Sequence, residues 1–248
     1  MNLADIKTIT IVGCGTMGNG ICQVFATCGY NVNLVDIDQE RLDRAVKAIS
    51  KSIDRLIKKE KLTEDDKTAI LGRIKTGTDL KVAADSQLVV EAVTENLPIK
   101  LDIFKKLADI CPPEVIFASN TSSLPITQLA TATGRPDQFI GMHFMNPVPM
   151  MKLIELIRGI ATSDETYRLI EELAKKLGKV PVEVNDYPGF IANRLLMPMI
   201  NEAVYALMEG VGTEAAIDEV MKLGMAHPMG PLTLADFIGL DVCLAIME

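Results

Sequence analysis

Two side chains in the middle of the sequence have the types of a proton-transfer pair, if the chain folds back between them. His143 lies near the end of the apolar run QFIGMHF (138–144), and Glu155 follows it after a proline-rich loop. An imidazole gives or takes a proton near neutral pH, and a neighbouring carboxylate orients the ring and stabilises its charged form. A lone histidine on a strand is usually structural. The chain's second histidine, His227, lies in a loop that connects helices, so position favours His143 as the catalytic candidate.

A glycine pattern near the N-terminus is typical of dinucleotide binding. Gly13, Gly15 and Gly18 follow a β-branched run and open an amphipathic segment. The first glycine permits a tight turn, the second lets the backbone approach a pyrophosphate, and the third allows close packing of helix and strand. Free N–H groups at the start of the helix, including those of Thr16 and Met17, favour phosphate. The pattern therefore predicts a dinucleotide site, whereas a glycine-rich turn without a ligand is the alternative.

Asp36 ends the next β-branched run, at 31–36. In this position a carboxylate accepts hydrogen bonds from the hydroxyls of the adenosine ribose, and its charge repels a 2′-phosphate. The sequence therefore favours NAD over NADP. Arg41 follows closely and could reach a 2′-phosphate, which leaves NADP open as the less favoured cofactor.

Three further segments carry polar or charged side chains. In SNTSS (119–123), the hydroxyls could bind a substrate oxygen, or Ser122 or Ser123 could be the N-cap of a helix over 124–130; both interpretations stay open. Asn193, in GFIANR, could donate to a substrate oxygen, although ordinary packing on a helix surface is the simpler role. The segment 41–61 holds eight Lys or Arg against three acidic residues. Such a stripe is usually a solvated helix face, but it would also suit coenzyme A.

Alternating strand and helix patterns must position these residues. They predict an α/β fold with a doubly wound, mostly parallel sheet, in which His143 and the 119–123 loop open onto the edge where ligands bind. Strands are expected at 6–12, 31–36, 86–93, 114–120, 138–144, 151–157 and 179–184, and helices at 17–27, 38–60, 98–110 and 164–177.

No strand is expected after Tyr187, where helices over 188–210, kinked at Pro198, and 213–223 predict a small all-helical domain. The expected boundary lies at NDYPG (185–189), which gives domains 1–186 and 187–248.

Composition restricts the possible partners. The 248 residues carry 25 Lys or Arg and 33 Asp or Glu, a net charge of −8 that disfavours nucleic acid and anionic membranes as main partners. The start of the chain lacks a signal-peptide pattern, and no apolar stretch approaches the ~20 residues of a membrane helix. Five cysteines without metal-like spacing predict reduced thiols in a cytoplasmic protein and no metal site.

Taken together, the motifs resemble the short-chain 3-hydroxyacyl-CoA dehydrogenases, most closely the bacterial 3-hydroxybutyryl-CoA dehydrogenases. The resemblance runs from about residue 7 to the C-terminus. It implies a Rossmann-type domain and a helical domain for substrate and dimerisation. It also implies NAD(H), an acyl-CoA substrate, a homodimer or higher oligomer, and a place in fatty acid and butanoate metabolism. The segments that carry it are GCGTMGNGI, EAVTENLPIK, SNTSSL, MHFMNPVPMMKLIE and the run from DYPGFIANR to GLD.

The resemblance also implies roles for individual residues. In the family pattern, His143 is the general acid/base and Glu155 its carboxylate partner, while Ser122 and Asn193 bind the 3-oxygen of the substrate. The expected cofactor residues are Gly13, Gly15, Thr16, Met17, Gly18, Asp36, Glu95, Lys100, Asn120 and Asn146. Ser52 and Lys59, together with Ser122, are the candidates for binding the coenzyme A substrate.

Two alternatives stay open. A related dehydrogenase acts on free 3-hydroxy acids through a lysine four residues after the helix asparagine, where this chain has Met197. A non-catalytic NAD-binding or structural relative is the other, although four intact residues argue against it: Ser122, His143, Glu155 and Asn193. Family members usually continue past GLDVCLAIME, so the second domain is expected to be truncated at Glu248.

Overall fold

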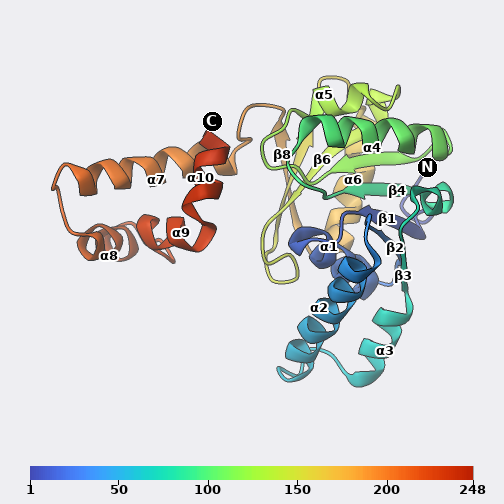
Figure 1. Cartoon of the computed structure of the whole chain (residues 1–248), viewed down its shortest axis with the longest axis horizontal. Helices are drawn as coiled ribbons and strands as arrows, with labels where there is room; N and C mark the ends of the chain where they lie inside the picture. Colours follow the sequence, from blue (N-terminus) through green and yellow to red (C-terminus); the bar gives the residue numbers. More distant parts are fainter. Residues whose placement is uncertain (248) are drawn as a thin grey trace. The chain divides into compact units, whose positions relative to one another are not determined.

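The computed structural model describes residues 1–247 (Figure 1). The chain divides into two compact units, Met1–Asp186 and Tyr187–Glu248. The last residue of the predicted second domain, Glu248, lies outside the described residues. The predicted fold class, an α/β unit followed by a helical one, is confirmed.

The first unit is built on one eight-stranded sheet in the order β3-β2-β1-β4-β5-β6-β7-β8. Its first six strands are mutually parallel and have the order 3-2-1-4-5-6 of a dinucleotide-binding fold. β7 runs antiparallel to β6, and β8 is parallel to β7. The strands are β1 (Thr8–Val12), β2 (Asn31–Val35), β3 (Ile74–Gly77), β4 (Leu88–Glu91), β5 (Ile116–Ser119), β6 (Phe139–Phe144), β7 (Leu153–Arg158) and β8 (Val180–Asn185).

Six α-helices and two short 3₁₀ helices connect these strands. They are α1 (Thr16–Thr27), α2 (Gln39–Ile57), α3 (Glu64–Gly72), η1 (Leu80–Asp85), α4 (Leu97–Ile110), α5 (Ile126–Thr131), η2 (Pro136–Gln138) and α6 (Asp164–Lys176). α2 begins after the N-cap Asp38, whose side chain accepts from the N–H of Glu40. It buries Leu42, Ile49 and Ile53, which lie on one face of the helix at helical spacing. The predictions contain neither α3 nor β3.

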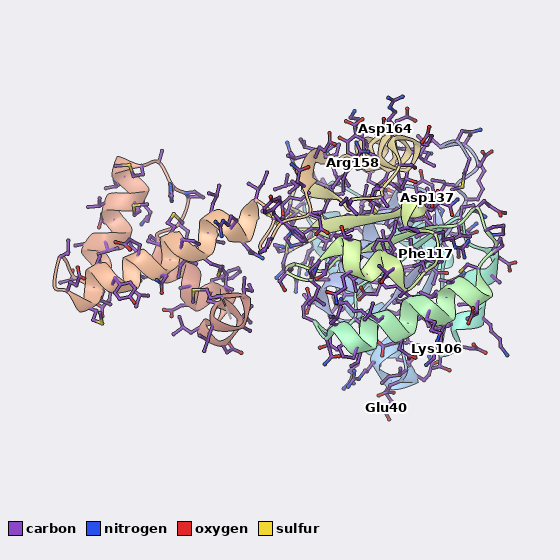
Figure 2. All side chains as sticks on the ribbon, turned by 90° about the horizontal axis from the view of Figure 1, so that it is seen from above. Glu40, Lys106, Phe117, Asp137, Arg158 and Asp164 are labelled. Carbon is purple, nitrogen blue, oxygen red and sulfur yellow. The ribbon has the colours of Figure 1, made fainter. Side chains whose placement is uncertain are left out.

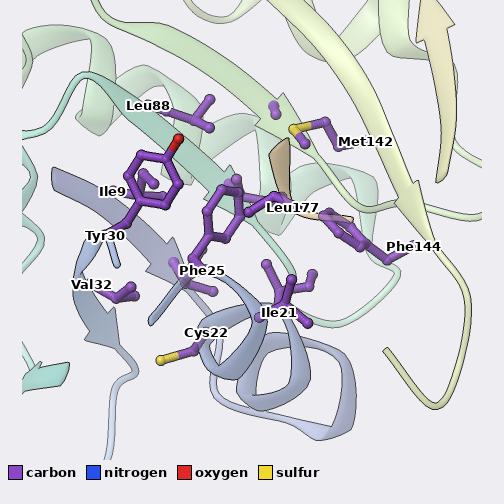
Figure 3. Close-up of a cluster of buried hydrophobic side chains, with 14 of the residues drawn as sticks. Ile9, Ile21, Cys22, Phe25, Tyr30, Val32, Leu88, Met142, Phe144 and Leu177 are labelled. Carbon is purple, nitrogen blue, oxygen red and sulfur yellow. The ribbon is translucent and has the colours of Figure 1, made fainter. Parts of the chain in front are cut away.

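One face of the sheet packs on α1, α2 and α6, and this core holds the start of α1 in place. Figure 3 shows Ile21 and Phe25 of α1 among side chains of the strands, including Ile9 and Leu88. The rings of Phe25 and Tyr30 meet edge to face, with centroids 5.9 Å apart. Such pairs add to the free energy gained by burial, so α1 is fixed against β1 and β2 at the glycine turn.

The other face packs on α4, where Phe104 contacts Phe117 and Phe139 edge to face. Strand residues alternate between the two faces. Because Val90, Ala118, Met142 and Ile154 belong to the first core, their neighbours face the second side. These neighbours are Glu91, Ser119, His143 and Glu155, so one face of the sheet presents all four.

The corner that follows β7 is fixed by an ion pair. Arg158 ends β7, and its guanidinium donates to Asp164 in the first turn of α6, with 2.6 Å between Nη2 and Oδ1. Figure 2 shows the two side chains next to each other. This contact anchors the end of the strand that carries Glu155.

The second unit consists of α7 (Ala192–Met208), α8 (Glu214–Gly224), α9 (Pro231–Ile238) and α10 (Leu240–Met247). Met197, Ile200, Ala235 and Cys243 form its core. Thr213 is the N-cap of α8, since its hydroxyl accepts from the N–H of Ala216. The last two helices are absent from the predictions. Across residues 1–247, no helix is both long and apolar enough to span a membrane.

Candidate active site

The glycine turn between β1 and α1 is a tight backbone structure. Gly13 has a φ of +99°, and a Cβ there would lie 2.5 Å from the carbonyl oxygen of Ala92. A Cβ at Gly18 would lie 1.8 Å from the carbonyl oxygen of Gly13. A Cβ at Gly15, by contrast, would meet no atom within 4 Å. Two glycines are therefore needed for packing, and the third leaves open space beside the backbone.

That open space adjoins the start of α1. Gly15 is the N-cap and offers no side-chain acceptor, so the first N–H groups of the helix, at Thr16 and Met17, face the turn without a capping side chain. Unpaired N–H groups and the positive end of the helix dipole favour an anion here. The arrangement fits the pyrophosphate of a dinucleotide.

Asp36 follows β2 and borders the same space. Its carboxylate accepts from the N–H groups of Cys14 and Ile37, both at 2.8 Å. It lines a cavity of about 450 Å³, together with Val12, Gly13, Gly15, Val35, Ile37, Arg41, Thr78, Leu80, Ala92, Val93, Thr94, Ile99, Asp102, Ile103 and Lys106. A carboxylate beside an apolar cavity fits a ribose and an adenine. The residues of the cavity and of the glycine turn therefore fit bound NAD.

We expect Asp36→Ala to weaken NADH binding about tenfold, because the ribose hydroxyls lose a charged acceptor. Titration of NADH fluorescence measures the dissociation constant. Asp43→Ala is the matched control, since Asp43 is exposed on α2 and pairs only with Gln39 among the contacts described here. Equal dissociation constants in both variants would disprove the ribose role of Asp36.

His143 and Glu155 face each other directly across the antiparallel strands β6 and β7. His143 Nδ1 lies 2.7 Å from Glu155 Oε2, and both side chains are buried, with 6% and 2% of their surface exposed. A carboxylate only accepts, so Nδ1 carries the hydrogen of this bond. The other ring nitrogen, Nε2, is therefore an acceptor in the neutral ring and lies 3.1 Å from the hydroxyl oxygen of Ser122.

The proposed capping role of Ser122 or Ser123 is wrong. α5 begins later, at Ile126, and its N-cap position is Pro125. The carboxylate of Asp186 supplies the cap from 60 residues away, accepting from the N–H of Ile126 at 3.0 Å and from that of Thr127 at 2.7 Å. The loop hydroxyls are therefore not used as a helix cap, and that of Ser122 contacts the imidazole.

Glu95 and Lys100 belong to a cluster under the same loop. Glu95 accepts from the N–H of Ser122 at 2.6 Å and from the hydroxyl of Thr121 at 2.9 Å. The Lys100 ammonium lies 3.2 Å from Glu95 Oε2 and 2.6 Å from Glu91 Oε1. The cluster ties the start of α4 to the loop that carries Ser122.

Glu91 is a site residue that the sequence predictions missed. It ends β4 fully buried, and it also accepts from the hydroxyl of Ser119 at 2.6 Å. Burial raises the pKa of its carboxyl above the usual value, and the Lys100 ammonium and the Ser119 hydroxyl offset only part of this rise. A carboxylate at the end of the buried run LVVE, nine residues before a lysine, is the sequence signal that could have identified the pair.

The two asparagines predicted for the cofactor lie after neighbouring strands, Asn120 after β5 and Asn146 after β6. Asn120 is buried, and its side-chain oxygen accepts from the N–H of Phe144 at 2.9 Å. Asn146 is exposed in the loop after β6. The buried ammonium of Lys179 holds that loop, donating to the carbonyl oxygens of Val148 at 2.5 Å and Met151 at 2.7 Å. Burial lowers the pKa of Lys179.

The remaining predicted residues lie apart from this cluster. Ser52 is half-buried on α2, and Lys59 is exposed just after it. Arg41 and Arg44, nearer the start of α2, line a second cavity of about 300 Å³ that also includes Asp36. Asn193 belongs to the second unit, in the first turn of α7, and its role toward the substrate stays a prediction.

Comparisons with known proteins agree over both units. Residues 8–187 match the model of the 3-hydroxyacyl-CoA dehydrogenase NAD binding domain, and residues 189–248 match that of the C-terminal domain. A probable 3-hydroxybutyryl-CoA dehydrogenase of Deinococcus radiodurans is 61% identical over 238 residues, which are 96% of this chain and 85% of that protein. One of Bacillus subtilis is 54% identical over 244 residues, covering 98% and 85%. The crystal structure of (S)-3-hydroxybutyryl-CoA dehydrogenase from Ralstonia eutropha superposes with a TM-score of 0.96 at 54% identity, covering 98% of this chain and 86% of that one.

Proposed function

Because the chain belongs to the 3-hydroxyacyl-CoA dehydrogenase family, we propose that it interconverts 3-hydroxybutyryl-CoA and acetoacetyl-CoA with NAD(H). The family is one of NAD-dependent oxidoreductases. The observation that carries the proposal is the alignment of Ser122, His143 and Glu155, with one ring nitrogen bound to a carboxylate and the other facing a hydroxyl.

These residues handle the proton of the reaction. In the oxidative direction, Nε2 of His143 removes the proton from the 3-hydroxyl group, and Glu155 stabilises the resulting imidazolium across 2.7 Å. The hydroxyl of Ser122 is placed to hold the substrate oxygen, a role we extend to Asn193 on the family pattern. Bound NAD⁺ supplies the acceptor for the hydride that leaves C3. In the reductive direction, protonated His143 returns the proton.

The glycine turn and Asp36 would hold NAD, and we assign Ser52 and Lys59 to coenzyme A. The charge of Asp36 favours NAD over NADP, although Arg41 lies close enough to line the same cavities. The alternative activity on a free 3-hydroxy acid requires a lysine where this chain has Met197, and that side chain is 4% exposed within the core of the second unit.

One assay separates these possibilities. We expect NADH oxidation with acetoacetyl-CoA, and much slower turnover with NADPH or with free acetoacetate. Turnover with free acetoacetate as fast as with the thioester would support the alternative dehydrogenase, and no turnover with any pair would support a non-catalytic relative.

The equilibrium between the two thioesters should depend on pH. Reduction consumes one proton, so lower pH favours 3-hydroxybutyryl-CoA, and the product ratio at a fixed NADH/NAD⁺ ratio should change about tenfold per pH unit. Chromatography of the thioesters after equilibration measures the ratio. A ratio that does not change with pH would contradict the scheme.

Assembly and location are part of the same proposal. The second unit exposes large apolar side chains, including Val220, Leu223, Phe237, Leu240 and Leu244, which would suit a homodimer or a higher homo-oligomer. All five cysteines are free thiols, in keeping with a reducing cytoplasm. Neither nucleic acid nor a membrane surface is a proposed partner.

A further inference from the structure

We propose that Glu91 is a positioning residue for the reaction: through the ammonium of Lys100 and the carboxylate of Glu95 it fixes Ser122 opposite His143. The inference rests on the proposed function, because it concerns how the same site is held in order. In this proposal Lys100 links two carboxylates of the protein, those of Glu91 and Glu95, whereas the family resemblance places this lysine on the nicotinamide side of the site.

The contacts of Lys100 support that role. Its side chain is 1% exposed, and the ammonium reaches Glu91 Oε1 at 2.6 Å, Glu95 Oε2 at 3.2 Å and the carbonyl oxygen of Val93 at 3.3 Å. An ammonium has three hydrogens to donate, and three acceptors surround this one. Lys100 is therefore saturated by the protein's own oxygens, and its charge orders the two carboxylates around it.

Glu95 carries the constraint to the loop. With one oxygen on the ammonium, its other oxygen accepts from the N–H of Ser122 at 2.6 Å, and the carboxylate also takes the hydroxyl hydrogen of Thr121. Since 41% of the Glu95 side chain is exposed, contacts with the loop alone would leave it freer to move. The fixed ammonium behind it supplies the second point of attachment.

Glu91 is the fixed end of this chain of contacts. Its side chain is fully buried and accepts from Lys100, from the hydroxyl of Ser119 and from the N–H of Val93 at 2.7 Å. β4 pairs with β5 directly at Glu91 and Ser119, so the carboxylate is bound to the centre of the sheet. Ser122 is therefore held in a fixed position relative to the sheet that carries His143 and Glu155.

Glu91→Gln tests the proposal, because it keeps the shape and an acceptor but removes the charge that holds Lys100. We expect kcat with acetoacetyl-CoA to fall about 10–100-fold, as misplacement of a reacting group does. In a Ser122→Ala background the same substitution should change kcat less than twofold, since there is no hydroxyl left to position. Equal fold-losses in both backgrounds would overturn the proposal, because independent effects add.

A second readout does not depend on activity. His143 and His227 are the only histidines of the chain, so ¹⁵N-histidine spectra contain two imidazoles, which His143→Gln assigns. Glu91→Gln should shift the Nε2 resonance of His143, should leave that of His227 in place, and should have no effect on His143 in the Ser122→Ala background. An unshifted His143 signal in a folded Glu91→Gln protein would overturn the inference, even if the wild-type chain proved inactive on acetoacetyl-CoA.

Thr10→Val is the matched control for stability. Thr10 is fully buried in β1 and shares a hydrogen bond of 2.7 Å with Ser86, apart from the residues of the proposed cluster. The Thr10→Val variant should have a lower midpoint of thermal unfolding, with the same kcat and the same His143 signal as the wild type. If Glu91→Gln does not fold, Ser119→Ala removes one donor to Glu91 and should give the same pattern to a smaller extent; a Ser119→Ala protein indistinguishable from the wild type in kcat and His143 signal would overturn the inference.

Discussion

Replacing His143 with Gln should lower kcat for the reduction of acetoacetyl-CoA by about 10²–10⁴-fold, the usual contribution of a positioned acid–base group. An amide fills similar space and can still donate to Glu155, so the buried carboxylate keeps a partner and the strands stay paired. The amide cannot, however, transfer a proton to the substrate oxygen. Steady-state kinetics measures kcat, and fluorescence titration should give an unchanged dissociation constant for NADH.

The matched control for this variant is His227→Gln. His227 is half-buried in the loop after α8, in the second unit, and its loss should leave kcat within twofold of the wild type. If the two variants retained similar activity, the assignment of the proton to His143 would be wrong. A loss confined to His227→Gln would move the acid–base role to the second unit.

The second large effect is expected at Glu155. Glu155→Gln removes the charge 2.7 Å from His143 Nδ1, and the loss in kcat should be about 10²–10³-fold, comparable to removal of one preorganised electrostatic contact. An amide nitrogen turned toward the ring would also favour the tautomer with hydrogen on Nε2. In that tautomer Nε2 cannot accept the hydroxyl proton, so oxidation of 3-hydroxybutyryl-CoA should suffer most.

Glu183→Gln controls for the removal of one negative charge from the neighbouring strand. Glu183 lies on β8, is exposed, and pairs with Arg158 at 3.2 Å. The Glu183→Gln variant should have the same kcat as the wild type in both directions of the reaction. Equal activity of the Glu155 and Glu183 variants would show that the imidazolium needs no counter-charge at this position.

The parts of the site that depend on local sequence were predicted well. Gly18 is required by its close approach to Gly13 within the β1–α1 turn, and Asp36 follows directly from the end of β2. Gly13 has a positive φ in the same turn, although the backbone it approaches most closely is that of Ala92, after β4. The pattern of glycines and a distant carboxylate reports this geometry because the whole unit is formed within a short stretch of chain. Five of the six mutually parallel strands were likewise found, since each is a short apolar run, whereas β3, with the sequence IKTG, was missed.

Contacts between distant segments were harder to predict. Spacing alone could not show that Glu155 opposes His143, because this depends on the antiparallel register of β6 and β7. A helix cap was one predicted role of Ser122, because nothing near it in sequence reveals that Asp186 caps α5. Glu91 looked like the end of an apolar strand. The short helices α9 and α10 were missed because their buried residues, Ala235 and Cys243, pack against residues of α7 that are distant in sequence.

The turn at residues 13–18 is held entirely by the protein's own atoms. Gly13 donates its N–H to the carbonyl of Val35 at 2.7 Å, and Cys14 donates to Asp36. The entropy of ordering this loop is therefore lost during folding and does not oppose the binding of the nucleotide. We expect NADH to associate in a single concentration-dependent phase, without a slow rearrangement step, so that differences in affinity among variants of this turn appear in the rate of cofactor release.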